Sequence, residues 1–311
     1  MSDRSDGLPC NIPGYEIISR LGTGGMSHVW KARETASGRI VALKILDKSY
    51  SRSQDDLRRF ENEERILETI DHPGIVKGYK FGFVAGTYTW YYAMEYVDGY
   101  DFGALLHRKQ HLREEDCLLI CESAALALDY AWREHSLVHC DIKPDNILIN
   151  TEGVIKLADL GLGQLVKEIG SRPASPHDFV LGTPDYISPE QIYSDAKLDC
   201  RADIYSLAAT LYRLSTGRML FPMSDKNDKL RAHCDDDCQG KDPRTYRPEL
   251  SDGFCRLLEA MLVKNRDGRI GRWSDVYDAC LAVENGVEIA QRRGPASSMR
   301  LGPVAPERIG I

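Results

Sequence analysis

The sequence of 311 residues has no apolar run near the roughly 18 residues that a membrane-spanning helix needs. Residues 1–14 are polar and lack the hydrophobic stretch of a secretory signal, so we expect a cytoplasmic protein with no membrane span. Aromatic residues are scarce, at 8%, but 42% of residues are hydrophobic and 28% are charged, as in soluble folded chains. Basic residues are not in excess, because the net charge is −7, and we therefore expect no nucleic-acid partner.

Cysteine pairs at the spacing of a disulfide framework are also missing. The 9 cysteines are scattered and odd in number, which favours reduced thiols. His233, Cys234 and Cys238 could suggest zinc. A second cysteine pair at zinc-finger spacing is absent, however, and aspartates fill the gap, so we expect no metal there.

The residue pattern before residue 98 predicts a β-rich region. Short β-branched and apolar segments are separated by glycine-containing turns, and no repeat of about 20–50 residues, the period typical of repeat proteins, is visible. A helix is predicted over Asp55–Ile70. The predicted strands are Tyr15–Leu21, Val29–Arg33, Ile40–Leu46, Tyr79–Val84 and Thr89–Met94.

After Gly99 the pattern becomes helical. Glu114–His135 carries apolar residues at alternating spacings of three and four, which predicts one buried stripe, and its first turn is acidic, as suits a helix N-terminus. The stripe consists of Leu118, Cys121, Ala125, Leu128 and Trp132. Further helices are predicted over Ala202–Thr216, Gly253–Val263 and Ser274–Glu284, and residues 286–311 are predicted to form a flexible tail.

A glycine-rich segment, Gly22-Thr23-Gly24-Gly25-Met26-Ser27-His28-Val29, lies between two predicted strands. Its glycines would let a hairpin fold closely over phosphates with its N–H groups inward, although a simple turn would look the same. No helix follows it, which excludes a dinucleotide fingerprint, and the Lys-Ser/Thr ending of a P-loop is absent.

Lys44 lies within the apolar strand Val41-Ala42-Leu43-Lys44 and would need an acidic partner if it were buried. At about 100° per residue, Glu63 falls nearer the centre of the apolar face of the predicted helix 55–70 than Glu64 does. Glu63 is therefore the candidate partner of Lys44. The alternative, that both glutamates are solvated, stays open at this point.

Three further segments follow in a characteristic order. They are His139-Cys140-Asp141-Ile142-Lys143-Pro144-Asp145-Asn146, then Asp159-Leu160-Gly161 after the strand Val154–Leu157, then Gly182-Thr183-Pro184-Asp185-Tyr186-Ile187-Ser188-Pro189-Glu190. Together with the glycine-rich segment and Lys44, they resemble the signature of the protein kinase family, in its serine/threonine branch and especially its bacterial members. The resemblance covers about residues 15–285.

The resemblance implies an α+β, two-lobed fold. A flexible N-terminal tail (1–14) would precede a small β-rich nucleotide-binding lobe (15–97), a larger helical catalytic lobe (98–285) and the C-terminal tail (286–311). It also implies an ATP-dependent protein kinase that uses Mg²⁺ and acts on Ser or Thr of a protein or peptide, with autophosphorylation as one option.

The resemblance assigns roles residue by residue. Asp141 would accept or orient the proton of the substrate hydroxyl, Lys143 would steady the γ-phosphoryl group, and Lys44 would hold the α/β-phosphates while paired with Glu63. Asn146 and Asp159 would bind Mg²⁺. The residues expected around the nucleotide are Leu21, Gly22, Thr23, Gly24, Gly25, Val29, Ala42, Lys44, Glu63, Met94, Glu95, Val97, Asn146 and Asp159.

Three structural roles follow from the same resemblance. Thr183 would hydrogen-bond toward Asp141 and Lys143, Asp203 would support the catalytic-loop backbone, and Arg269 would pair with Glu190. These contacts are expected to hold the catalytic region in place rather than to take part in the reaction.

The chain also departs from the family pattern. Ser27 replaces a glycine, Leu160 replaces a phenylalanine in the metal-binding triplet, and Ala208 stands where glycine is more common. Cys140 replaces an arginine that often binds an activation-loop phosphate, and a thiol cannot make that charge-assisted bond. We therefore expect activity to depend little on phosphorylation of Ser171 or Ser175 through this contact.

Two other functions are compatible with parts of this pattern. A pseudokinase, a nucleotide-binding signalling scaffold without turnover, is supported only by Ser27, Cys140 and Leu160. A small-molecule kinase is disfavoured by Lys143 and by the Gly182–Glu190 segment, which resemble peptide-docking parts.

Overall fold

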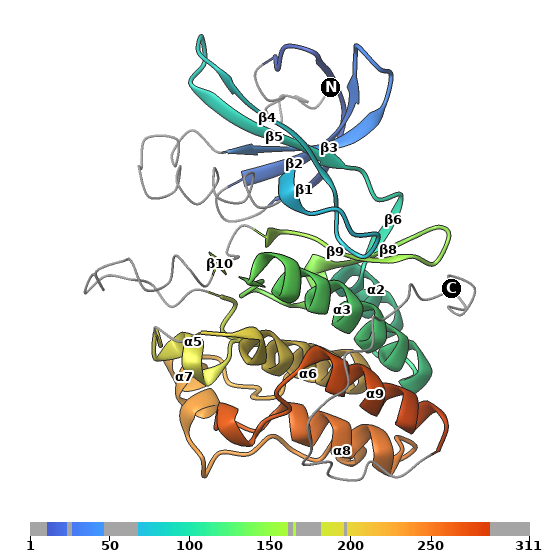
Figure 1. Ribbon diagram of the computed structural model, residues 1–311, viewed down its shortest axis with the longest axis vertical. Coiled ribbons are helices and arrows are strands. Elements are labelled where there is room, and N and C mark those ends of the chain that lie inside the picture. The colour runs from blue at the N-terminus through green and yellow to red at the C-terminus, as the bar shows by residue number, and fades with distance from the viewer. Residues whose placement is uncertain are drawn as a thin grey trace, which may run out of the picture. The chain divides into compact units, whose positions relative to one another are not determined.

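The computed structural model describes residues 11–23, 27–46, 68–160, 164–165, 182–195 and 198–286. The chain divides into two compact units, one of Met1–Asp71 with Val76–Val97 and one of His72–Ile75 with Asp98–Ile311. The first contains a five-stranded sheet and the second contains the long helices, which confirms the expected α+β class (Figure 1). His72–Ile75 joins the second unit because Ile75 forms a parallel bridge with Leu157.

The sheet of the first unit is antiparallel throughout, in the order β1-β2-β3-β5-β4. All five predicted strands are present, with small shifts at their ends, where turns rather than apolar alternation set the limits. The strands are β1 (Tyr15–Thr23), β2 (Ser27–Glu34), β3 (Ile40–Leu46), β4 (Gly78–Val84) and β5 (Thr89–Glu95).

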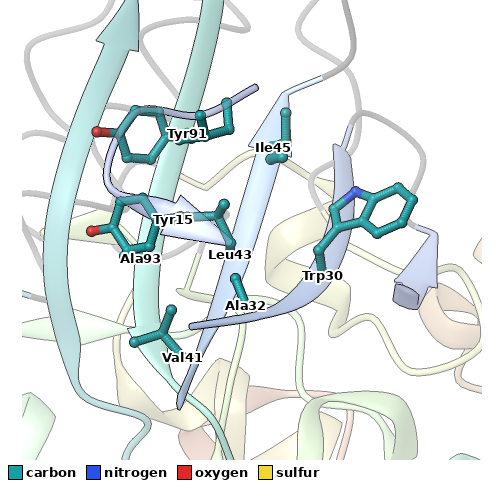
Figure 2. Packing of buried hydrophobic residues seen from close by; sticks show 9 residues of the cluster. Tyr15, Trp30, Ala32, Val41, Leu43, Ile45, Tyr91 and Ala93 are labelled. Atoms are coloured by element: carbon teal, nitrogen blue, oxygen red, sulfur yellow. The ribbon is translucent and has the colours of Figure 1, made fainter. Parts of the chain in front are cut away.

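One face of this sheet carries the hydrophobic core of the unit (Figure 2). Successive strand side chains point to opposite faces, so alternate residues of β2, β3 and β5 meet on the same side. The Tyr15 and Tyr91 rings pack edge to face with centroids 5.6 Å apart. The cluster consists of Ile12, Tyr15, Trp30, Ala32, Val41, Leu43, Ile45, Tyr91 and Ala93.

The helix expected over Asp55–Ile70 lies largely outside the described residues. Only its end is described, and there Glu68 and Thr69 are helical. Glu63, Gly24 and Gly25 also fall outside the described residues.

The second unit contains the long helices, two small sheets and short helical turns. Its helices are α2 (Phe102–Lys109), α3 (Glu114–His135), α5 (Pro189–Ile192), α6 (Cys200–Thr216), α7 (Lys226–Cys234), α8 (Asp252–Met261) and α9 (Trp273–Glu284). Strands β6 (Gly99–Asp101), β8 (Ile147–Asn150) and β9 (Ile155–Leu157) form one sheet, and β7 (Leu137–Val138) pairs with β10 (Gln164–Leu165). The turns are η1 (Pro144–Asn146), η3 (Pro243–Thr245) and η4 (Arg266–Gly268).

Helix α3 has the predicted bounds but a wider buried surface than predicted. Four of the five stripe residues are buried, and Trp132 is partly buried against Val138, Cys140, Leu198 and Ala202. Burial also extends to neighbouring positions around the helix, because α6, α9 and β9 all pack on it. Apolar periodicity predicted the helix, but it could not predict that three elements would pack around it.

Helix α6 is buried along almost its whole length. Asp199 caps its N-terminus by accepting from the Arg201 N–H, and Gly217 ends it with a φ of +69°. A Cβ at Gly217 would lie 2.4 Å from the carbonyl oxygen of Gln110, so both the conformation and the close approach require glycine.

Helices α2, α5 and α7 were not predicted. The first two are short, and α7 has no clear apolar stripe: its buried residues are Ala232 and His233. Asp225 caps α7 by accepting from the N–H groups of Asn227 and Asp228. Local capping and tertiary packing therefore define this helix more than its hydrophobic pattern does.

Candidate active site

The carboxylate of Asp141 is the centre of a hydrogen-bonded cluster in the second unit. Its Oδ1 accepts from the Thr183 N–H at 3.0 Å and from Thr183 Oγ1 at 2.6 Å. Its Oδ2 accepts from Lys143 Nζ at 2.6 Å and from Asn146 Nδ2 at 3.2 Å. Lys143 Nζ also donates to Thr183 Oγ1 at 3.1 Å, so the predicted contacts of Thr183 are confirmed.

Asn146 and Asp159 are close to each other because their backbone segments are hydrogen-bonded. The Ala158 N–H donates to the Asn146 carbonyl at 2.9 Å, and Asp159 follows with a φ of +62°. Asn146 Nδ2 also donates to the Asp141 carbonyl at 2.9 Å. Because the amide nitrogen of Asn146 donates to Asp141, the amide oxygen of Asn146 is left as the atom suited to a cation.

These two side chains present the hard oxygen ligands that Mg²⁺ prefers. Within the described ranges, no group of three His, Cys, Asp or Glu side chains is placed to hold a metal ion. The Asn146 amide oxygen and the Asp159 carboxylate would suit a Mg²⁺ that takes few protein ligands and completes its shell with phosphate oxygens and water.

The backbone before Asp141 is held by Asp203 of α6, as expected. The Asp203 carboxylate accepts from the His139 N–H at 2.7 Å and from the Cys140 N–H at 2.9 Å. Burial raises the pKa of Asp203 to about 6, although the His139 side chain and the two N–H groups favour its ionised form. The Cys140 thiol is buried, with Sγ 3.6 Å from the Val138 carbonyl oxygen.

The segment after Thr183 is anchored by the predicted pair of Glu190 and Arg269. Both side chains are buried, and the guanidinium donates to the two carboxylate oxygens at 2.6 and 3.2 Å. Arg269 also donates to the carbonyl groups of Val263, Lys264 and Arg201. One guanidinium therefore ties the start of α5 to the backbone of Arg201 and of the consecutive residues Val263 and Lys264.

Three contacts in this region were not predicted from the sequence. Gln191 Nε2 donates to the Cys140 carbonyl at 2.8 Å, and Thr210 Oγ1 donates to the Ile142 carbonyl at 3.2 Å. Lys229 of α7 pairs with Asp185 at 2.5 Å. The position of Gln191 directly after Ser188-Pro189-Glu190 is the only sequence signal that could have drawn attention to one of them.

In the first unit, four predicted nucleotide-binding residues share the sheet face opposite the core. Register pairs Val29 with Lys44 and Ala42 with Met94, and residues two apart in β3 point the same way. The core residues Leu43 and Ala93 alternate with them. Strand register thus brings Val29, Ala42, Lys44 and Met94 to one surface, on which Lys44 is buried.

The other described nucleotide-site residues lie at strand ends. Leu21 falls at an irregularity of β1 and is exposed, and Gly22 pairs with Val29. The Glu95 N–H donates to the Lys77 carbonyl at 2.8 Å at the end of β5. Thr23 ends β1, where Arg20 donates to its hydroxyl, and Val97 is the last residue of the first unit.

Leu160 is buried, as expected for an apolar side chain in the phenylalanine position. Ser27 is also buried and begins β2, where it pairs with Leu46. Ala208 is fully buried within α6. Each departure from the family pattern is accommodated without placing a charge in the core.

The ordered motifs agree with comparisons to known proteins. The family model described as "protein kinase domain" matches residues 15–280. This chain belongs to the protein kinase domain family. The match confirms the resemblance found in the sequence, and the two units contain the parts expected of a kinase domain.

Individual relatives include bacterial proteins. The kinase domain is 33% identical over 272 residues to a probable serine/threonine-protein kinase of Streptomyces coelicolor, covering 86% of this chain and 40% of that protein. It is 31% identical over 292 residues to the serine/threonine-protein kinase PknA of Mycobacterium tuberculosis, covering 93% and 64% respectively. A PknA protein of Corynebacterium glutamicum is 36% identical over 210 residues, covering 67% of this chain and 44% of the relative.

The matches therefore span less than two thirds of each of these relatives. In the part of the kinase domain that the structure describes, no helix combines the length and apolar character needed to traverse a bilayer.

Proposed function

We propose that this domain is an ATP-dependent serine/threonine protein kinase, which transfers the γ-phosphoryl group of Mg-ATP to a Ser or Thr hydroxyl. The observation that carries the proposal is the cluster in which Thr183, Lys143 and Asn146 fix both oxygens of Asp141. The relatives named as serine/threonine kinases support the same choice of acceptor.

The four donors have a mechanistic consequence. A carboxylate offers about four lone-pair positions, and all four are used by the Thr183 N–H, Thr183 Oγ1, Lys143 and Asn146. An incoming hydroxyl must therefore replace one of them to reach Asp141. Lys143 is suited to leave, because its flexible side chain is 22% exposed and its ammonium can turn toward a phosphoryl oxygen.

Asp141 then orients the substrate hydroxyl for attack on the γ-phosphorus and receives the hydroxyl proton late in the step. The bond between the γ-phosphorus and the bridging oxygen breaks, and ADP leaves with that oxygen. Positioning and charge neutralisation supply most of the rate enhancement in such a transfer.

Each unit carries residues that we propose for nucleotide binding. Val29, Ala42 and Met94 offer an apolar surface for adenine, while Glu95 and Val97 would read its edge through backbone groups. Gly22, with Thr23, Gly24 and Gly25, would cover the phosphates, and Lys44, with Glu63 as its proposed partner, would hold them. Asn146 and Asp159 would hold Mg²⁺, which neutralises the triphosphate charge when bound.

We further propose that the substrate is a protein or peptide and that the domain works in the cytoplasm. Autophosphorylation is included in this proposal, since the chain itself contains Ser and Thr. The free thiols of the eight described cysteines suit a reducing compartment.

A phosphotransfer assay tests the proposal. The purified chain is incubated with Mg²⁺ and γ-labelled ATP, alone and with a basic protein, beside Asp141→Asn. We expect phosphoserine or phosphothreonine in the wild type and a loss of about 10³-fold in the variant, as for removal of a general base. ATP binding without turnover would instead indicate a pseudokinase, and turnover confined to small alcohols a small-molecule kinase.

A further inference from the structure

Gln191 of α5 makes a hydrogen bond to the catalytic loop that lies 51 positions away in the chain. Its Nε2 donates to the Cys140 carbonyl at 2.8 Å, and its side chain is buried. Cys140 directly precedes Asp141. The family resemblance assigned this glutamine no role.

The orientation of the Gln191 amide is fixed by its other contacts. Its Oε1 accepts from the Ser188 N–H at 3.2 Å and from Ser188 Oγ at 2.9 Å. A backbone N–H can only donate, so the oxygen must face Ser188 and the nitrogen must face the Cys140 carbonyl. The side chain therefore joins the start of α5 to the catalytic loop as a directed link.

The catalytic loop needs such a link because Cys140 has a left-handed conformation. Its φ is +67°, a region that non-glycine residues rarely adopt and that the surroundings must maintain. Asp203 holds the N–H groups of His139 and Cys140 on one side of this kink. Gln191 holds the Cys140 carbonyl on the other side, so the peptide leading into Asp141 is held at both ends.

The backbone at Gly182 leaves room for this contact. A Cβ at Gly182 would lie 3.0 Å from the Cys140 carbonyl oxygen and 3.3 Å from Gln191 Nε2, and its φ of +127° also favours glycine. The next residue, Thr183, binds Asp141 directly. Gly182, Thr183 and Gln191 thus bring the 182–191 segment against both residues of the Cys140-Asp141 pair.

We infer that Gln191 is a positioning residue that sets the orientation of Asp141 through the Cys140 carbonyl. The link is uncharged and needs no phosphate, which suits a loop where Cys140 replaces the arginine. It rests on the proposed function for its catalytic consequence, but the link itself can be tested without activity.

Two variants separate the donor from the rest of the side chain. Gln191→Leu removes the whole amide at similar size. Gln191→Glu keeps an oxygen for Ser188 but turns an acceptor toward the Cys140 carbonyl. Tyr212→Phe is the matched control, because it also removes one 2.8 Å hydrogen bond to a carbonyl, that of Lys241, in the same unit but away from the catalytic loop.

We expect kcat to fall about 10-fold in Gln191→Leu and at least as much in Gln191→Glu, with KM for ATP and peptide changed less than about twofold. Tyr212→Phe should keep the wild-type kcat. Activity of Gln191→Glu relative to wild type should rise toward lower pH, because a protonated carboxyl can donate to the carbonyl as the amide does. A role confined to fold stability would change the fraction of folded protein and leave kcat per folded enzyme at the wild-type value.

Hydrogen exchange of the amides of residues 140–142 provides the readout that does not require catalysis. Exchange there should be about 10-fold faster in Gln191→Leu and unchanged in Tyr212→Phe, since only the first variant removes an anchor of the loop. If the wild type shows no phosphotransfer, the proposed function fails, and exchange alone decides the link. If the wild type is active, a folded Gln191→Leu variant with the wild-type kcat would overturn the inference. If the wild type is inactive, a folded Gln191→Leu variant with wild-type exchange at residues 140–142 would overturn it.

Discussion

The two units place their site residues by different means. In the first, Val29, Ala42, Lys44 and Met94 share a surface because β-strand register puts them there. In the second, the distant Thr183 hydroxyl donates to Asp141, the distant Asp203 carboxylate holds the backbone before it, and the loop includes a left-handed residue, Cys140. Strand register depends on backbone pairing, so we expect it to survive the replacement of one side chain. The loop depends on hydrogen bonds from side chains, so we expect its geometry to change when one of these side chains is replaced.

The pair of Arg269 and Glu190 should give the largest effect on stability. Arg269→Met leaves the buried Glu190 carboxylate unpaired, and we expect the free energy of unfolding to fall by about 3–5 kcal/mol. Chemical denaturation measures this. Arg269→Met combined with Glu190→Gln should recover part of the loss.

The exposed pair of Lys77 and Asp71 in the first unit is the control for this experiment. Lys77→Met should leave the unfolding midpoint nearly unchanged, because solvent screens that pair. If Arg269→Met and Lys77→Met lowered the free energy of unfolding equally, the buried pair would stabilise the fold no more than the surface pair does.

Lys44→Met tests the first unit directly. We expect phosphotransfer to fall about 10²-fold, as when one electrostatic donor is removed, while thermal stability is kept, because methionine suits a buried position beside Ala42 and Met94. Steady-state kinetics and thermal unfolding are measured on the same preparation. A variant that unfolds would show that Lys44 supports the fold and that register alone does not arrange this face.

Thr183→Val tests the second unit at matched size. It removes the hydroxyl that donates to Asp141 and accepts from Lys143, and we expect kcat to fall about 10-fold, with Thr183→Ser close to wild type. The comparison is made by kcat at saturating ATP and peptide. Equal activity of the valine and serine variants would show that the backbone N–H of Thr183 suffices.

A pH dependence of stability is expected at His233, which lies outside the Asp141 cluster. Burial, and then the charge of Lys264, lowers the pKa of His233 from 6.5 to about 4. Between these values the unfolded chain binds a proton that the folded chain does not, so this contribution to stability is lost as pH falls from 6.5 toward 4.

Asp203 acts in the opposite direction, because its raised pKa favours the folded state as pH falls toward 4. Comparison of wild type with His233→Gln cancels the contribution of Asp203. We expect the stability difference between them to shift by about 2–3 kcal/mol over this range, measured by urea denaturation at several pH values. A constant difference would show that His233 does not titrate as its burial implies.

The sequence alone determined the strands of the first unit, the long helices of the second and the order of the motifs around Asp141. Apolar periodicity is a local property, and it therefore predicted α3 within its bounds. The contacts expected of Thr183, Asp203 and Arg269 came from family resemblance, not from spacing.

Only the tertiary structure decided the short polar helices α5 and α7, the burial of α3 on several sides and the contacts of Gln191, Thr210 and Lys229. Gln191 and Cys140 lie 51 positions apart, and no local pattern marks their hydrogen bond. Such contacts depend on where the packed helices bring two loops together, because a buried carbonyl must find a donor wherever the fold supplies one.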